Sequence, residues 1–132
     1  MRGILAKSAV LDSSSVLAVL FDEPGGEAVS DLFNGGLLSA VNLAEVLTKL
    51  KQGCWETDFV WDRVLNMGIE VCPYGAEQAR LTAELIHQTR PFGLSLGDRA
   101  CLALAIQRKA TVYTTDRVWK QLDLGIEVVA IR

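Results

Sequence analysis

The sequence is poor in the residues that build zinc sites or covalent cross-links. Its 132 residues include one histidine and three cysteines, and the cysteines form no C-x-x-C pair. These features predict neither a zinc site nor a disulfide framework. We interpret Cys54, Cys72 and Cys101 as small buried apolar residues of a protein in a reducing cytoplasm.

Long apolar runs and an excess of positive charge are also missing. No apolar stretch approaches the roughly 18 residues of a membrane span, and the N-terminus lacks the apolar core of a signal peptide. We therefore expect a cytoplasmic protein that does not enter a membrane. The 13 basic and 16 acidic residues give a net charge of −3. This balance argues against a highly basic nucleic-acid binder, although local basic patches stay possible.

What the chain does contain is apolar patterning sufficient for one core. Half of the residues are hydrophobic, and no repeat or linker divides the chain, so we expect a single domain over residues 1–132. Helical patterns alternate with short apolar runs that resemble buried strands, at residues 9–11, 36–41, 69–74, 111–115 and 126–131. This alternation predicts an α/β fold, a three-layer α/β/α sandwich with a central, mostly parallel sheet.

Several helix ends can be assigned from local signals. Asn42 is interpreted as the N-terminal cap of a helix that Gly53 ends. The pattern of residues 76–90 predicts one amphipathic helix that Pro91 terminates. Residues 97–108 predict a helix that is apolar nearly all round after its first turn, which is typical of a buried helix.

Four acidic residues fall at or near the carboxyl ends of the expected strands. Asp12 follows the first strand, and Glu45 lies one turn into the helix after the second. Asp98 opens the apolar helix, and Asp116 follows the fourth strand. Because the carboxyl ends of parallel strands share one edge, where ligands bind, we expect these four carboxylates to lie near one another.

Each acid also has a purely structural explanation. Acidic residues complement the dipole of a first helical turn. Asp12 and Asp116 could be N-caps, and two pairs resemble capping boxes, Asn42-x-x-Glu45 and Ser95-x-x-Asp98. Taken singly, a capping role is the more economical interpretation of each acid.

The four acids taken together favour a bound cation. Ser, Thr or Asn could cap equally well, whereas four clustered carboxylates repel one another and raise one another's pKa unless a cation is present. An all-oxygen ligand set suits Mg²⁺ or Mn²⁺, which favour phosphate oxygens as further ligands. A metal-bound water of lowered pKa could then attack phosphorus in line, so the pattern indicates a metal-dependent phosphodiesterase.

Four segments carry a family resemblance, in the order VLDSSSVLAVLFDEPG, SAVNLAEVLTKL, LSLGDRACLALA and YTTDRVWKQLDLGIEV. They resemble the PIN-domain ribonucleases, and specifically the VapC toxins of bacterial toxin-antitoxin pairs. The likeness runs over essentially the whole chain. It implies an α/β/α sandwich, a homodimer, and a Mg²⁺- or Mn²⁺-dependent endoribonuclease. Such an enzyme cuts structured or translation-linked RNA, commonly a transfer RNA, and a cognate antitoxin holds it inactive.

The resemblance carries the acidic residues of the family over to Asp12, Glu45, Asp98 and Asp116 as catalytic and metal-binding residues. It implies that the first three contact the principal ion, directly or through water, and that Asp116 completes the shell or holds a second ion. Some family members have another acid just after the fourth position, where this chain has apolar residues. Whether one or two ions bind therefore stays open.

Four neighbours of these acids are candidate substrate contacts. Ser14 and Thr115 could hold a metal-bound water or a phosphate through their hydroxyl groups, although turn and cap roles fit equally well. Arg99 and Arg117 each follow an acidic candidate directly and could clamp a phosphate, or they could form surface salt bridges.

The aromatic and apolar residues allow two further interpretations. Trp55, Trp61 and Trp119 could stack on bases, but core or dimer packing is favoured by their apolar neighbours. Leu32, Phe33 and Phe59 exceed what a small core needs, which favours a homodimer.

Other functional classes fit the sequence less well. A phospho-accepting receiver domain needs an acidic pair near the first strand, but Ser13 follows Asp12, and a D-x-D phosphatase needs an acid where Ser14 stands. The main alternative is a PIN-like module that binds RNA or protein with little catalysis. Clustered acids argue against such a module, because binding a polyanion gains nothing from them without a metal.

Overall fold

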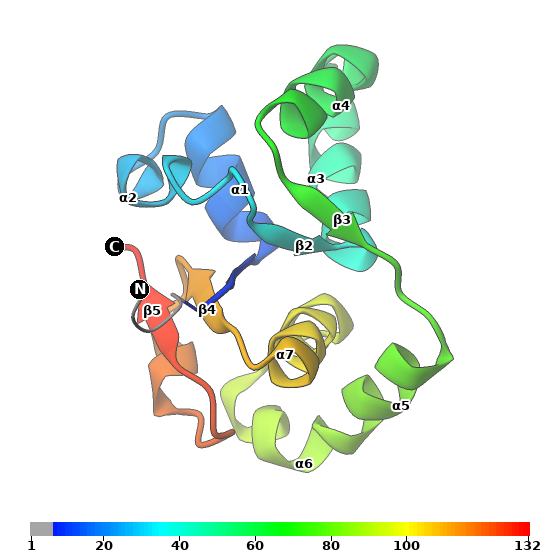
Figure 1. Ribbon diagram of the computed structural model, residues 1–132, viewed down its shortest axis with the longest axis vertical. Helices are drawn as coiled ribbons and strands as arrows, with labels where there is room; N and C mark the ends of the chain where they lie inside the picture. The colour runs from blue at the N-terminus through cyan, green and yellow to red at the C-terminus, as the bar shows by residue number, and fades with distance from the viewer. Residues whose placement is uncertain (1–6) are drawn as a thin grey trace, which may run out of the picture.

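The computed structural model describes residues 7–132 (Figure 1). The expected domain of residues 1–132 and the N-terminal stretch searched for a signal peptide both include residues 1–6, which lie outside the described residues. The strands within the described part are β1 (Ala9–Leu11), β2 (Leu37–Ser39), β3 (Glu70–Cys72), β4 (Thr111–Thr114) and β5 (Val128–Ala130). The α-helices are α1 (Ser13–Leu20), α2 (Gly26–Ser30), α3 (Ala40–Gln52), α4 (Thr57–Asn66), α5 (Ala76–Glu84), α6 (Ile86–Thr89) and α7 (Leu96–Arg108). Two 3-10 helices are η1 (Arg90–Phe92) and η2 (Arg117–Gln121).

The strands form one sheet in the order β3-β2-β1-β4-β5, and each pairing in it is parallel. Val10 of β1 pairs with Leu37 of β2 on one side and with Val112 of β4 on the other. The chain therefore starts at the centre, builds β2 and β3 outward, and then crosses to β4 and β5. The strand order reverses between β1 and β4, which is where ligand sites form in such sheets.

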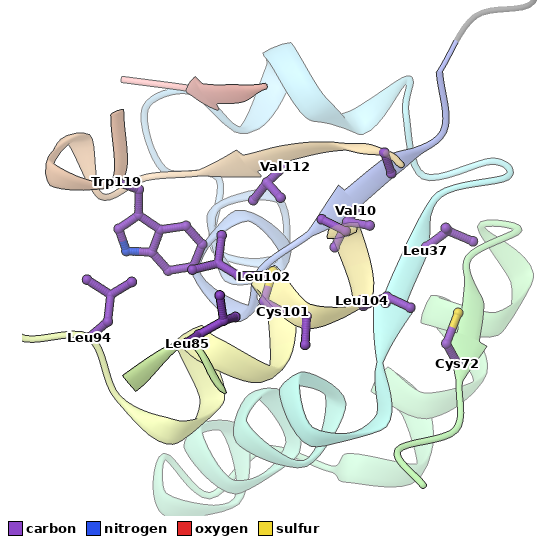
Figure 2. Packing of buried hydrophobic residues seen from close by; sticks show 13 residues of the cluster. Val10, Leu37, Cys72, Leu85, Leu94, Cys101, Leu102, Leu104, Val112 and Trp119 are labelled. Atoms are coloured by element: carbon purple, nitrogen blue, oxygen red, sulfur yellow. The ribbon is translucent and has the colours of Figure 1, made fainter. Parts of the chain in front are cut away.

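Helices cover both faces of this sheet, so the predicted α/β/α sandwich is confirmed. Alternate side chains of each strand point to opposite faces. In Figure 1, α1 to α4 lie on one side of the sheet and α5 to α7 on the other. Leu11 and Leu38 pack in a cluster with residues of α1 to α4, and Val10 and Val112 pack in a second cluster with residues of α7. Figure 2 shows the second cluster, which includes Trp119 and Leu102.

Helix α7 is buried nearly all round, as its composition predicts. The run from Ala100 to Ala105 is buried at every position. Its small alanine side chains allow the helix to fit between the sheet and helices α3 and α5, which it contacts on its other sides. The first turn of α7 thereby reaches the carboxyl edge of the sheet.

Two expected helix ends are wrong. Ser39 caps α3 in place of Asn42, because the Ser39 hydroxyl accepts a hydrogen bond from the Val41 N–H at 3.2 Å. The helix still stops at Gly53 as predicted. The single helix expected over residues 76–90 is divided between α5 and α6, and Pro91 lies inside η1. Thr82 and Thr89 donate to the carbonyl groups four residues earlier, a contact that often bends helices.

The packing expectations are only partly confirmed. Trp119 is 1% exposed and belongs to the core, whereas Trp55 and Trp61 are 44% and 43% exposed. From the sequence, Phe33 is expected to be an apolar residue that the core does not need, but it is buried in the core. Cys54 is expected to be buried, but it is exposed. None of the helices within residues 7–132 has both the length and the apolar character needed to cross a bilayer.

The burial of Trp119 makes the core sensitive to its truncation. Replacing Trp119→Ala should lower the free energy of unfolding by about 3–5 kcal/mol, because it leaves a large cavity. Trp119→Phe should cost less, since the indole N–H is buried without a hydrogen-bond partner among the described residues. Urea unfolding measures both. The exposed Trp61→Ala is the control and should stay within about 0.5 kcal/mol of the unaltered protein. Equal losses at both tryptophans would contradict this packing.

Candidate active site

Asp12 is the most buried of the four acids, at 4% exposure. It ends β1 and caps α1, where its Oδ1 accepts hydrogen bonds from the Ser15 N–H at 2.8 Å and the Ser14 hydroxyl at 2.7 Å. Its Oδ2 accepts from the Thr114 hydroxyl at 2.6 Å. The predicted cap role is confirmed, and these contacts fix the carboxylate between β1, α1 and β4.

Thr114 links two of the acids, a role that the sequence reasoning did not assign. Its hydroxyl donates to Asp12 and accepts a hydrogen bond from the backbone N–H of Asp116 at 3.0 Å. The adjacent candidate, Thr115, contributes its backbone N–H to the Ser14 hydroxyl at 3.1 Å. The sequence held a signal for this role. Alternate residues of a strand share one face, so Thr114 points the same way as the buried Val112, toward the interior.

Asp98 and Asp116 both bond the backbone at the start of a helical segment, Asp98 as the third residue of a capping box and Asp116 as the N-cap, as their positions predict. Asp98 Oδ2 accepts from the Ser95 N–H at 2.9 Å, and the Asp98 N–H donates to the Ser95 hydroxyl at 3.2 Å, which completes a capping box. Asp116 Oδ1 accepts from the Val118 N–H at 3.1 Å at the start of η2. Each carboxylate thus commits one oxygen to the backbone. Within residues 7–132 the other oxygen of each accepts no hydrogen bond from protein.

Glu45 projects from α3 onto the first turn of α7. The Asn42 side-chain amide donates to Glu45 Oε1 at 2.9 Å and to the carbonyl oxygen of Gly97 at 3.0 Å. A Cβ atom added at Gly97 would overlap the Glu45 carboxylate. This carboxylate therefore occupies the space that a side chain at position 97 would fill, one residue from Asp98.

The acids influence one another electrostatically. Burial raises the pKa of Asp98, and the charges of Glu45 and Asp116 raise it further, against the hydrogen bonds from Ser95. Burial also raises the pKa of Asp12, although the hydrogen bonds from Thr114, Ser14 and Ser15 oppose this.

The same negative charges affect the thiol of Cys101. It is fully buried on α7, and burial raises its pKa well above the usual value. Three of the acids raise this pKa further, namely Asp12, Asp98 and Glu45. Thr114 links Asp12 to the backbone of Asp116, and the Glu45 carboxylate lies against Gly97 beside Asp98, so the fold brings the four acids together at the carboxyl edge of the sheet.

The four acids lie near one another but do not form a complete metal-binding site by themselves. Within residues 7–132, no three Asp, Glu, His or Cys side chains converge tightly enough to enclose a metal ion. The donors still fit Mg²⁺ or Mn²⁺, because Mg²⁺ is usually bound by one or two carboxylates, with water and phosphate completing the shell. The carboxylate oxygens that Asp98 and Asp116 leave without a protein donor suit that kind of coordination.

The two candidate arginines make contacts within the protein. Arg99 donates to the Thr82 carbonyl of α5 at 3.0 Å, and its Nε is buried without a partner among the described residues. Arg117 donates to the Arg132 carbonyl at 3.2 Å. Their contact with a substrate phosphate stays a prediction.

Comparison with known proteins identifies the family. The profile of the PIN domain matches residues 9–124. The chain belongs to the PIN domain family. This family is generally one of nucleases, and the resemblance to PIN domains noted in the sequence is confirmed. A search of curated proteins found no match.

Solved structures similar to this PIN domain include toxin-antitoxin complexes. A toxin-antitoxin complex from Klebsiella pneumoniae is 18% identical, with a TM-score of 0.70 over 95% of this chain and 98% of that one. DNA-bound VapBC from Salmonella typhimurium is 15% identical, with a TM-score of 0.72 over 96% and 99% of the two chains. VapBC-1 from nontypeable Haemophilus influenzae is 16% identical, with a TM-score of 0.68 over 93% and 97%. At these identities the likeness establishes a shared fold.

The raised pKa of Asp12 predicts how stability depends on pH. Because the folded state favours the protonated carboxyl, Asp12 contributes most to stability below the unfolded pKa of about 3.9, and this contribution is lost as pH rises through the folded pKa. In EDTA, the unfolding free energy of the unaltered protein should therefore fall relative to Asp12→Asn as pH rises. Urea unfolding of both proteins between about pH 3 and 8 measures the difference. A difference that rises with pH would indicate a lowered pKa.

Proposed function

We propose that this PIN domain is a Mg²⁺- or Mn²⁺-dependent endoribonuclease that acts as the toxin of a type II toxin-antitoxin system. The observation that carries the proposal is the position of Asp12, Glu45, Asp98 and Asp116. They share one edge of the parallel sheet, at the reversal between β1 and β4, in a family whose members are generally nucleases.

The four acids would hold the divalent ion, and the ion would supply a water of lowered pKa and polarise the phosphodiester. The chain itself contributes fixed geometry. Thr114 and Ser14 hold the Asp12 carboxylate in one orientation, and Ser95 does the same for Asp98. Carboxylates held in this way need little rearrangement when charge develops on the transferring phosphate.

We propose structured RNA, such as a transfer RNA, as the substrate. With an acidic edge and a net charge of −3, the chain gains little RNA affinity from overall charge. The predicted phosphate contacts are Ser14, Arg99, Thr115 and Arg117. Ser14 lies closest to the acids, because its hydroxyl donates to Asp12 and accepts a hydrogen bond from the backbone N–H of Thr115.

A cognate antitoxin is the proposed protein partner, by analogy with the toxin-antitoxin complexes that share this fold. Exposed apolar side chains support a partner on the α4 side of the molecule, namely Trp55, Phe59, Trp61 and Leu65. Trp55 and Phe59 also line a cavity of about 200 Å³, together with Leu20 at the end of α1 and Met67, which follows α4. The predicted homodimer stays a prediction.

The alternative is a PIN domain that binds RNA or protein without cutting. Because Asp12 and Asp116 are N-caps and Asp98 completes a capping box, part of their occurrence has a purely structural cause. Metal dependence separates the two functions. A binding module would hold RNA equally well in EDTA and would leave it intact.

Cleavage of cellular RNA tests the proposed function. The purified protein, freed of any co-expressed partner, should produce discrete new 5′ ends with Mg²⁺ or Mn²⁺, which sequencing maps, and none in EDTA. Asp98→Asn keeps the size and capping ability of the side chain while it removes a charge. This substitution should lower the cleavage rate by more than about 100-fold. Loss of a residue that only orients a metal ligand typically costs about 10–100-fold, and Asp98 is proposed to bind the metal itself.

Asp62→Asn is the matched control, because Asp62 is an exposed acid of α4. It should cut at the same sites and at the unaltered rate. Intact RNA with the folded, unaltered protein, or cleavage by Asp98→Asn at the full rate, would contradict the proposed function.

A further inference from the structure

Asn42 occupies an unusual position for an amide side chain. It lies on α3 at 1% exposure, and its Nδ2 donates to Glu45 Oε1 and to the Gly97 carbonyl. Both partners can only accept, so the orientation of the amide is fixed. Its Oδ1 is then buried without a hydrogen-bond donor among the described residues.

Packing alone does not account for this residue. A buried carbonyl oxygen without a donor destabilises a fold, and an apolar residue at position 42 would avoid that cost. An apolar residue would, however, leave the Glu45 carboxylate without the donor that fixes it. Aspartate at position 42 would set a second carboxylate against Glu45 and against the Gly97 carbonyl.

Gly97 confines the same carboxylate from the other side. It is buried in the first turn of α7 and directly precedes Asp98. Since a Cβ there would overlap the Glu45 carboxylate, this carboxylate lies between the Asn42 amide and the α7 backbone. The Asn42 amide also bonds that backbone through the Gly97 carbonyl, so it spans α3 and α7.

We propose that Asn42 is a positioning residue that holds the Glu45 carboxylate beside the first turn of α7 and so sets its place relative to Asp98 for a shared divalent cation. The inference rests on the proposed function, because it assigns Asn42 to the same metal site. Asn42 acts through Glu45 and touches neither the cation nor the substrate. Glycine is required at position 97 for a related reason, because a side chain there would displace the Glu45 carboxylate.

Direct Mn²⁺ binding tests this role without any assay of cleavage. Electron paramagnetic resonance measures the free Mn²⁺ that remains during a titration of the protein. Asn42→Ala should weaken Mn²⁺ binding by about 10–100-fold, the usual effect of losing a residue that orients a metal ligand. Gln52→Ala is the matched control, because Gln52 is an exposed amide at the far end of the same helix. It should leave the affinity unchanged, and urea unfolding confirms that each variant is folded.

A double-mutant cycle separates positioning from a general structural effect. If Asn42 acts through Glu45, then Asn42→Ala should have no further effect on Mn²⁺ affinity in a Glu45→Ala background. Gly97→Ala approaches the same carboxylate from α7 and should also weaken binding while Asn42 is intact. This second variant keeps the inference testable if Asn42→Ala does not fold.

The outcomes distinguish this inference from the proposed function. If the unaltered protein binds Mn²⁺ and cuts RNA while Asn42→Ala binds Mn²⁺ within twofold of it, only the positioning role is wrong. An equal loss from Asn42→Ala with and without Glu45 would also overturn that role. If the unaltered protein neither binds Mn²⁺ nor cuts RNA, both the role and the proposed function are wrong.

Discussion

The buried carboxylate of Asp12 is the constraint on which the rest of the site depends. It accepts hydrogen bonds from α1 and from Thr114 of β4, so one side chain joins the central strand, the first helix and the strand beyond the reversal. A buried negative charge is costly unless it is compensated. The hydroxyl and amide donors compensate it in part, and the raised pKa shows that the compensation is incomplete.

Capping and metal binding are compatible roles for these acids. Asp98 and Asp116 each use one oxygen to satisfy backbone N–H groups at a helix start, which orients the carboxylate. Orientation of this kind is what a metal ligand needs. Glu45 caps no helix, and its orientation comes from Asn42 and from the absence of a side chain at Gly97. A capping role for Asp98 and Asp116 is therefore compatible with the proposed metal-binding role, because one oxygen of each carboxylate serves the helix start and the other stays available.

Much of this arrangement could be predicted from the sequence, because the parallel α/β pattern alone places strand ends at one edge. The alternation of elements, the capping box at Ser95 and the four acids all follow from local signals. The contacts that cross the fold could not be predicted. Asn42 resembled a cap, but Ser39 begins the helix earlier and frees Asn42 to bond Glu45 and Gly97. Strand alternation indicates that Thr114 rather than Thr115 points inward, but the hydrogen bond from its hydroxyl to Asp12 depends on how β4 is aligned with β1.

The most direct test of the central claim is a crystal structure of the protein with Mn²⁺, analysed by anomalous scattering at the manganese edge. If the four acids bind a divalent cation, an anomalous peak should lie among Asp12, Glu45, Asp98 and Asp116, with one or more of their carboxylate oxygens at coordination distance and water completing the shell. A well-ordered site without such a peak at saturating Mn²⁺, or a peak elsewhere on the molecule only, would contradict the claim that these four acids gather around a shared cation.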